Sequence, residues 1–305
     1  MKISVIIPCL NAANTITQQL DALANQSVQP WEVIVSDNGS TDATRDIADQ
    51  YAAKFSQFRI VDASLRKGAS HARNIGAAAA TGDYFAFCDA DDIVAQGWLA
   101  ALQNAFAEHS FLASRFDYKL LNDVVDNSNQ DTELQNFRIP FLPFAGGCGL
   151  AIRRDLHEAV SGFDESILYL EDVDYCIRLQ LLGETLTFVP EALIHIRYSS
   201  NPDTNFFSTR KACYRHAYNW GAGMAKLYGK YHDQGMELHG IAPRLVLVPL
   251  WMLRAIFTVF DYKSIERIGW HVGVLQELIQ LRLSSAGLLQ GKSAWSSGNL
   301  KSAEN

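Results

Sequence analysis

This 305-residue sequence lacks the features of secreted and membrane-spanning proteins. Its five cysteines form no Cys-x-x-Cys pair and no even-numbered framework, so we expect reduced thiols rather than disulfides. The apolar run at Met1–Pro8 is too short for a signal peptide. A spanning helix needs about 20 mainly apolar residues, whereas the longest charge-free piece within 241–260 is Leu245–Leu253. These absences favour a cytoplasmic globular protein.

Glycine-rich phosphate loops are also missing. The residues after the first predicted strand, Pro8–Asn11, include neither glycine nor a basic side chain, as a nucleotidyltransferase would require there. The glycines at Gly146–Gly149 lack the G-x-G-x-x-G spacing of a dinucleotide-binding turn. We interpret them instead as a place where the backbone approaches a bound ligand closely, with Gly147 in contact.

Charge divides the chain into two parts. Residues 1–204 contain 14 basic and 27 acidic residues, whereas residues 205–292 contain 11 basic and 5 acidic ones. An acidic front and a basic back indicate separate functional regions. We therefore expect a catalytic domain over 1–204, a helical, basic and aromatic region over 205–290, and a flexible tail over 291–305.

The front part alternates apolar β-branched runs with helical patterns. We expect strands over 3–7, 31–36, 58–63 and 84–88, and helices over 13–24, 41–54 and 69–80. This alternation predicts an α/β fold with a mostly parallel sheet flanked by helices. Ligands bind beyond the carboxyl ends of the strands in such sheets. Four residues should meet at that rim: Asn11, Asp37, Arg66 and Asp89.

Three carboxylates occupy four positions at the end of one predicted strand, in Asp89–Asp92. Aspartate is a poor strand residue, and like charges this close repel one another. Clustered carboxylates commonly hold a hard cation such as Mg²⁺, shared with substrate phosphates. The alternative is a helix N-cap followed by a solvated turn. On the segment alone the two interpretations stay open.

Four motifs in order resemble those of family 2 glycosyltransferases. They are Ser4–Asn11, Asp37–Asp42, Ala72–Gly76 and Asp89–Asp92. The similarity continues through Gly146-Gly147, Gly162–Glu165 and Glu171–Arg178, and it fades after about residue 200. The resemblance implies the GT-A fold and an inverting, metal-dependent enzyme that uses a nucleotide-sugar donor.

The resemblance also implies roles at the donor site. Asp91 would bind a divalent Mn or Mg ion, and Asp89 would contact the metal or the ribose. Asp92 would be a cap or a supporting group. His195, after a predicted strand, would lie near the metal or the diphosphate, although a lone histidine is more often structural. The nucleotide would contact these residues: Pro8, Asn11, Asp37, Arg66 or Lys67, Arg73, Asp89 and Gly147.

An inverting transfer needs a base that deprotonates the acceptor hydroxyl. The resemblance assigns this role to Asp172, with Glu171 as the second candidate. Both precede a helix that we expect to begin near Val173, so capping of that helix is the alternative. Asp174 is expected to be structural.

The predicted function is transfer of a sugar to a hydroxyl of a glycan acceptor in cell-surface polysaccharide biosynthesis. We expect a lipid-linked acceptor, attachment at the inner face of the membrane, and no nucleic-acid partner. The alternatives are a nucleotidyltransferase and a sugar-nucleotide-binding protein without activity. Tyrosines, tryptophans and basic residues mix beyond Pro202, and an apolar helical stripe runs from Ile265 to Leu283. This region indicates either a helix on the membrane surface or a packing subdomain.

Overall fold

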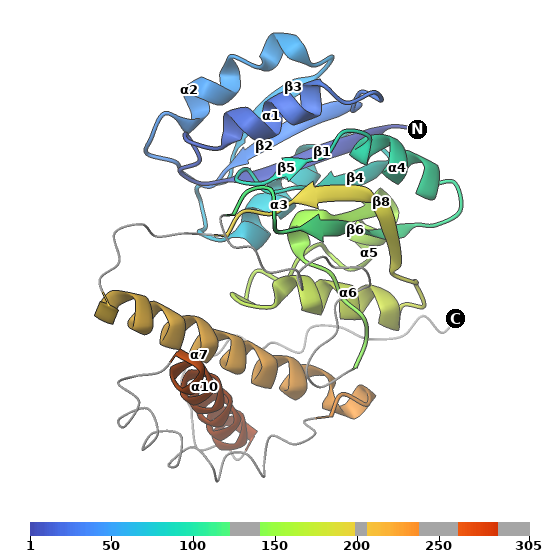
Figure 1. Cartoon of the computed structure of the whole chain (residues 1–305). Coiled ribbons are helices and arrows are strands. Elements are labelled where there is room, and N and C mark those ends of the chain that lie inside the picture. Colours follow the sequence, from blue (N-terminus) through green and yellow to red (C-terminus); the bar gives the residue numbers. More distant parts are fainter. Residues whose placement is uncertain (123–140, 199–205, 238–261, 286–305) are drawn as a thin grey trace, which may run out of the picture. The chain divides into compact units, whose positions relative to one another are not determined.

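The computed structural model describes residues 1–122, 141–198, 206–237 and 262–285 (Figure 1). They form two compact units. The first comprises Met1–Thr209 with a short segment after Tyr231, and the second comprises Arg210–Tyr231 and the helix within Gly240–Asn305. The predicted tail over 291–305 and the whole apolar segment 241–260 lie outside the described residues.

An eight-stranded sheet forms the centre of the first unit, in the order β3-β2-β1-β4-β7-β6-β8-β5. Strands β3, β2, β1 and β4 are adjacent and parallel, and β6 is parallel to β8. Strand β7 runs antiparallel to β4 and β6, and β5 runs antiparallel to β8. The strands are β1 (Ile3–Cys9), β2 (Glu32–Asp37), β3 (Phe58–Asp62), β4 (Tyr84–Phe87), β5 (Ile93–Val94), β6 (Phe111–Asp117), β7 (Leu150–Arg153) and β8 (Thr187–His195). The predicted α/β class with a mostly parallel sheet is confirmed.

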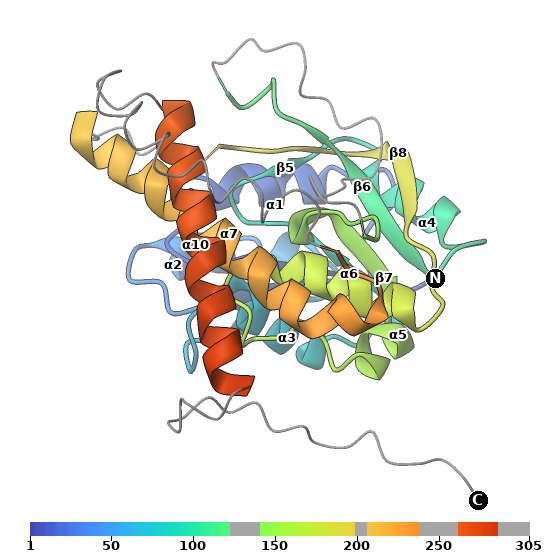
Figure 2. The ribbon, with the colours of Figure 1, turned by 90° about the horizontal axis from the view of Figure 1, so that it is seen from below.

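Helices cover both faces of this sheet (Figures 1 and 2). On one face lie α1 (Ile16–Ala24), α2 (Thr44–Asp49) and α4 (Trp98–Ala105). On the other lie α3 (Ala69–Ala79), α5 (Arg154–Ala159) and α6 (Glu171–Leu181). Short 3₁₀ turns complete the list at η1 (Ala52–Lys54), η2 (Gly147–Gly149) and η3 (His232–Gln234).

Strand β1 shows why the sheet needs two layers of helices. All seven of its residues are buried, and successive side chains of a strand point to opposite faces. Val5 and Ile7 join the core that α1 and α4 cover. A separate aromatic cluster, in which Phe87 contacts Phe163 and Phe163 stacks on Tyr175 at 4.2 Å between ring centroids, fills the space under α5 and α6.

Two predicted helices differ from the observed ones. The helix expected over 41–54 is broken into α2 and η1, because the chain turns at Tyr51 and buries this ring to 7% exposure. Helix α6 begins at Glu171 rather than near Val173. Glu171 and Asp172 therefore lie in the first helical turn.

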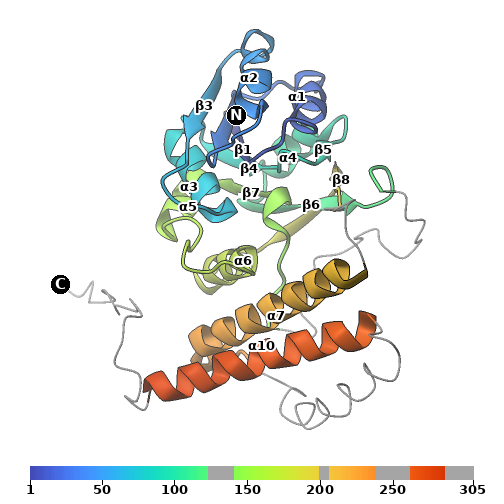
Figure 3. The same ribbon diagram turned by 90° about the vertical axis from the view of Figure 1, so that its left-hand side faces the viewer.

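The second unit pairs α7 (Phe206–Tyr231) with α10 (Tyr262–Ser285), side by side (Figure 3). Their backbones approach so closely that a Cβ atom on Gly273 would lie 2.1 Å from the carbonyl oxygen of Tyr218, so only glycine fits there. The contacts advance in the same direction along both helices, which are therefore parallel: Tyr214 with Gly269, Tyr218 with Gly273, and Gly229 with Leu281.

The predicted apolar stripe lies on α10 and is only partly covered. Ile265 is buried, whereas Leu275 and Ile279 are 43% and 48% exposed. Among the residues described, no helix combines the length and the apolar character needed to cross a membrane.

Candidate active site

A cavity of about 550 Å³ opens at the carboxyl ends of the parallel strands. It is bordered by the segment after β1, by Asn38 after β2, by the start of α3, by the aspartates after β4, and by Arg197 and Tyr198 after β8. Five of the predicted site residues line it: Pro8, Asn11, Lys67, Asp89 and Asp91. This is the rim at which the sequence places the ligand.

Asn11 joins the ends of β1 and β2. Its backbone has a φ of 51°, a left-handed conformation that asparagine tolerates better than most residues. Its N–H donates to Ser40 Oγ at 2.9 Å, and its Oδ1 accepts from the N–H of Thr41 at 2.8 Å. The loop after β1 is therefore fixed against the loop after β2.

Four predicted nucleotide contacts lie outside the cavity lining, and Asp37 and Arg66 are two of them. Asp37 is buried and accepts hydrogen bonds from the Ser40 N–H at 3.1 Å and from Arg45 at 3.2 Å. Arg66 pairs with Glu165 at 2.9 Å. Asn38, the neighbour of Asp37 in sequence, lines the cavity, and so does Lys67, the predicted alternative to Arg66. The roles of Asp37 and Arg66 stay predictions.

The three aspartates after β4 have different surroundings. Asp89 pairs with Arg73 at 2.9 Å, and Asp91 is exposed to the cavity. Asp92 is 3% exposed, and its Oδ1 accepts from the N–H of Arg197 at 2.9 Å. Burial and the charge of Asp89 raise the pKa of Asp92 to about 8, and the same causes raise the pKa of Asp91. A cation bound by these carboxylates would offset the repulsion between their negative charges.

The residues present fit a divalent metal ion. Ligand atoms of Asp89, Asp92 and Cys148 lie within 4.8 Å of one another, and Asp91 opens into the adjoining cavity. Carboxylate oxygens are the ligands that Mg²⁺ and Mn²⁺ prefer.

His195 lies at the end of β8, opposite Ile93 of β5 and thus next to the aspartate segment. Its Nδ1 is 2.6 Å from Asp117 Oδ2. A carboxylate on one ring nitrogen is the usual support for a histidine whose other nitrogen binds a metal. The arrangement suits the predicted metal role of His195, which stays a prediction.

Arg73 connects the metal motif to the predicted base. Its guanidinium is 4% exposed and reaches Asp89 at 2.9 Å and Glu171 at 3.3 Å. A buried charge of this kind is stable only when partners neutralise it. The α3 arginine therefore fixes the aspartates after β4 and the start of α6 at one place.

Gly147 and Asp172 meet on the other side of this arginine. The Gly147 N–H donates to Asp172 Oδ2 at 3.1 Å. A Cβ on Gly147 would lie 2.9 Å from Arg73 Nη1, so a side chain here would displace the guanidinium. The close approach of this backbone to a bound ligand stays a prediction.

Both candidate bases are hard to ionise. Burial raises the pKa of Asp172, and the positive charge of Arg73 only partly opposes this effect. Burial and the neighbouring Asp172 charge raise the pKa of Glu171 as well. Carboxylates with raised pKa values beside a cavity are typical of general acids and bases.

Two contributors to the site have no signal in the sequence motifs. Arg197 Nε donates to the Asp91 carbonyl at 2.9 Å, and this side chain lines the cavity. Gln19 of α1 is fully buried, donates to the Asp89 carbonyl at 3.0 Å, and accepts from the Val94 N–H. The one sequence signal for Gln19 is its position among the apolar residues Ile16, Leu20 and Leu23 on one face of α1.

Comparison with known proteins identifies the family. The model of glycosyl transferase family 2 matches residues 4–161, and that of glycosyl transferase family group 2 matches residues 84–291. The chain belongs to glycosyl transferase family 2. The predicted family is thereby confirmed, and its members are glycosyltransferases, the enzyme class that the sequence predicts.

Curated relatives match over part of their length. Glycosyltransferase AglE of Haloferax volcanii is 28% identical over 198 residues, which cover 63% of this chain and 65% of that protein. Poly(ribitol-phosphate) beta-glucosyltransferase of Bacillus spizizenii is 30% identical over 150 residues, covering 46% of this chain and 24% of that protein. The chain thus spans less than two thirds of these relatives.

Solved structures share the fold. Mannosyltransferase PcManGT from Pyrobaculum calidifontis, in complex with GDP-Man and Mn²⁺, aligns with a TM-score of 0.61 at 18% identity, over 91% of this chain and 87% of that one. S. aureus TarS 1-349 in complex with UDP-GlcNAc aligns with a TM-score of 0.55 at 16% identity, over 94% and 92%. The predicted GT-A fold is confirmed.

Proposed function

We propose that this protein is a metal-dependent inverting glycosyltransferase that moves a sugar from a nucleotide-sugar donor to a hydroxyl of a glycan acceptor. One observation carries the proposal. Arg73 joins Asp89, which lines the large cavity, to Glu171, which adjoins Asp172. A donor held in the cavity would therefore lie beside a pair of carboxylates able to accept a proton.

The donor would occupy the cavity after β1 and β4. Its size of about 550 Å³ falls in the range of small-molecule sites. Lys67 and Arg197 supply positive charge for phosphates on two sides. Asp89 and Asp91 would hold the Mn²⁺ or Mg²⁺, with His195 as a further ligand, and this ion would neutralise the diphosphate leaving group.

Asp172 would act as the base. The acceptor hydroxyl would give its proton to the Asp172 carboxylate while its oxygen forms a bond to the anomeric carbon. The bond from that carbon to the phosphate oxygen would break on the opposite side, which releases the nucleoside diphosphate and inverts the configuration. The Gly147 N–H and the Val173 N–H, at 3.1 and 2.8 Å, fix both carboxylate oxygens of Asp172.

We propose further that the acceptor is lipid-linked and that the second unit contacts the inner face of the membrane. Trp220 on α7 is 40% exposed, and Leu275 and Ile279 on α10 are exposed too. Lys211 and Arg215 are exposed on α7. Apolar and basic side chains together are typical of helices that lie on anionic membranes, where each basic residue contributes about 1 kcal/mol.

A donor screen tests the enzymatic proposal. Purified protein is mixed with UDP-, GDP- or dTDP-sugars, with and without MnCl₂, and thermal unfolding and release of nucleoside diphosphate are measured. We expect one nucleotide class to raise the Tm only with metal, and slow hydrolysis of that donor. Stabilisation without hydrolysis or transfer would indicate a sugar-nucleotide-binding protein instead.

Sedimentation with vesicles tests the membrane proposal. We expect full-length protein to sediment with vesicles that contain phosphatidylserine and to be partly released by high salt. Neutral phosphatidylcholine vesicles are the control. If the protein stays in the supernatant with both vesicles, the exposed face of α10 serves packing or oligomerisation.

A further inference from the structure

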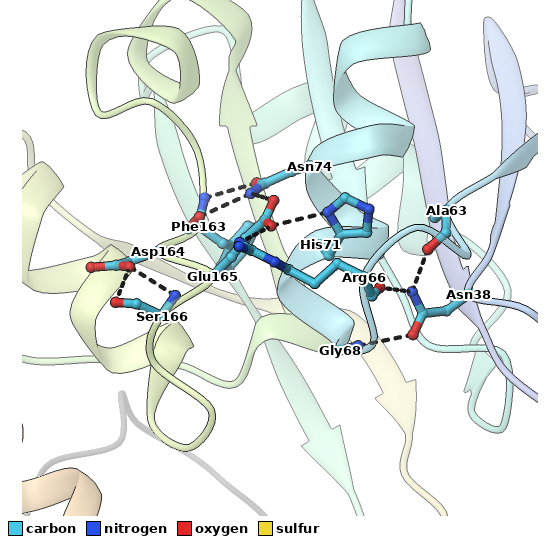
Figure 4. A network of polar contacts seen from close by, with 10 residues as sticks. All are labelled: Asn38, Ala63, Arg66, Gly68, His71, Asn74, Phe163, Asp164, Glu165 and Ser166. Carbon is cyan, nitrogen blue, oxygen red and sulfur yellow. Dashed lines mark hydrogen bonds and ion pairs between the residues drawn. The ribbon is translucent and has the colours of Figure 1, made fainter. Parts of the chain in front are cut away.

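The segment between α5 and α6 leads directly to the predicted base in the first turn of α6, and α3 holds this segment in place. Asn74 of α3 binds the backbone of Phe163 as a neighbouring strand would (Figure 4). Its Nδ2 donates to the Phe163 carbonyl at 2.9 Å, and its Oδ1 accepts from the Phe163 N–H at 2.9 Å. The start of the segment is therefore fixed to the helix that also carries Arg73.

Glu165 is the centre of a second set of contacts in this segment (Figure 4). Its Oε1 accepts from Asn74 Nδ2 at 3.0 Å, and its Oε2 lies 3.0 Å from His71 Nδ1 and 2.9 Å from Arg66 Nη1. Burial opposes ionisation of this carboxyl, but the hydrogen bonds from Asn74, His71 and Arg66 outweigh it and lower the pKa of Glu165. Glu165 is thus an anion with a full set of donors.

The contact with Arg66 leads to the donor cavity. Asn38 donates to the carbonyls of Arg66 at 2.7 Å and Ala63 at 2.6 Å, and accepts from the Gly68 N–H at 2.9 Å. Asn38 and Gly68 both line the large cavity. The loop that borders the donor is therefore bonded to the segment that precedes the base.

A small cavity shows that Glu165 lies near the catalytic pair. This cavity of about 60 Å³ is lined by both Glu165 and Glu171. It is also lined by Lys67 and Gly68, which border the large cavity as well. The small cavity therefore adjoins the large one, and Glu165 and Glu171 both border the small cavity.

The segment ends in a strained residue. Leu170, directly before Glu171, has φ 68° and ψ 29° and is 5% exposed. A left-handed conformation costs a leucine roughly 1–2 kcal/mol, so the contacts around it must hold it there. Glu171 and Asp172 are the next two residues, so the position of their side chains depends on this turn.

We infer that Glu165 is a positioning residue that holds the Phe163–Leu170 segment and thereby sets the place of Asp172 relative to the donor. The inference rests on the proposed function, in which Asp172 is the base. Glu165 does not touch the reacting atoms in this account. It acts through the segment that it fixes to α3 and to the loop at Arg66.

Variants at Glu165 test this inference, because a positioning role should lower kcat and leave the Kd of the nucleoside diphosphate nearly unchanged. The probes are UDP-glucose, UDP-N-acetylglucosamine and GDP-mannose with MnCl₂, and the one hydrolysed fastest is used. Misplacing a catalytic group by about 1 Å can cost 10²-fold in rate. We expect Glu165→Ala to lower kcat about 10- to 100-fold while the Kd of the nucleoside diphosphate changes less than about threefold.

Glu165→Gln keeps the shape of the side chain and removes its charge, so it decides the matter if the alanine variant does not fold. We expect a loss of about tenfold in kcat, again with little change in Kd. The matched control is Asp21→Asn, which removes the exposed ion pair with Lys54 at 2.8 Å, away from the cavity. Its kcat should stay within about twofold of the wild-type value. An unchanged kcat in Glu165→Gln, or a Kd that weakens in step with kcat, would overturn the inference.

A double variant separates this inference from the proposed function. If Glu165 acts through Asp172, then Glu165→Gln in the Asp172→Asn background should leave the residual rate unchanged within about twofold. A further loss that equals the loss in the wild-type background would overturn the inference. Full turnover by Asp172→Asn alone would instead show that the proposed base is wrong, and the single Glu165 variants would still decide whether Glu165 affects kcat.

Discussion

Buried carboxyl groups lie at both ends of the parallel strands, and their pKa values are shifted in opposite directions. At the amino end, Glu32 is 1% exposed and accepts hydrogen bonds from Ser4, Thr81, Gly82 and Arg59. Although burial opposes ionisation, these bonds lower the pKa of Glu32 to about 2. At the carboxyl end, Asp92 is 3% exposed, and its pKa is raised to about 8 by burial and by Asp89.

Burial raises the pKa of both carboxyl groups; hydrogen-bond donors outweigh it at Glu32, whereas the charge of Asp89 adds to it at Asp92. A buried charge stabilises a fold only when its hydrogen-bonding capacity is met. Glu32 ties β2 to β1 and to the turn before β4, so it serves stability. The aspartates after β4 concentrate negative charge beside a cavity, and Arg73 and the Arg197 N–H supply only part of the compensation. Such an excess is expected where a cation and a substrate complete the site.

The largest expected effect is on rate, at the carboxyl end. Asp172→Asn should lower kcat by about 10²- to 10⁴-fold, because the amide cannot accept the acceptor proton. The Tm and the Kd of the nucleoside diphosphate should stay close to the wild-type values. Steady-state kinetics and calorimetry on the same preparation would measure both. A loss of donor binding in folded protein would place Asp172 in the donor site instead.

A variant at the amino end of the strands should lose stability and keep donor binding. Glu32→Ala should lower the free energy of unfolding by about 3 kcal/mol, because it leaves the buried donors of Ser4, Thr81 and Gly82 without an acceptor. Donor binding should not change. Urea denaturation checks the stability. Asp155→Asn, which breaks an exposed ion pair with Arg153, is the control and should change it by less than about 1 kcal/mol.

The pH dependence of stability sharpens the same contrast. The pKa of Glu32 is lower in the folded protein, about 2, than in the unfolded chain, about 4.5. Its contribution is therefore complete above pH 4.5 and is lost as the pH falls towards 2. The difference in unfolding free energy between wild type and Glu32→Gln should narrow over that interval. A constant difference down to pH 3 would show that the charge of Glu32 does not contribute.

The smallest expected effect is a gain in stability. Asp92→Asn can keep the bond from the Arg197 N–H and removes a poorly compensated charge. In metal-free protein at pH 8 we expect the Tm to rise by about 2–4 °C, equivalent to about 1 kcal/mol for a domain of this size. Differential scanning calorimetry would detect the change. A fall in Tm would mean that the Asp92 charge stabilises the metal-free fold.

The sequence predicts the first four strands well because they are short apolar runs that end in polar residues, whereas it gives no prediction for β5, β6 and β7. The β1 run from Ile3 and the aspartates after Phe87 needed no tertiary information. The interruption of the helix predicted over 41–54 could not be predicted, since the turn at Tyr51 depends on the burial of its ring in the folded protein. The start of α6 at Glu171 depends on the left-handed Leu170, a conformation that leucine does not favour by itself.

Within the site, the sequence predicts residue types better than partners. The motifs gave Asp89, Arg73 and Glu171 separately, whereas their connection through one guanidinium is a property of the fold. The ion pair of Arg66 with Glu165 joins residues 99 positions apart. Long-range pairs of this kind follow from packing, so the role of Glu165 could not be assigned in advance although the residue lies in the Gly162–Glu165 motif, and Arg197 lies in no motif at all.

The central claim is that the aspartates after β4 hold a divalent cation that binds the donor diphosphate. Isothermal titration of UDP and GDP, with Mn²⁺ and with EDTA, into wild-type protein and Asp91→Ala tests it directly. The account predicts that Mn²⁺ strengthens binding of one nucleotide to the wild type at least tenfold, and that this gain disappears in folded Asp91→Ala. Equal metal-dependent affinity in both proteins would contradict it.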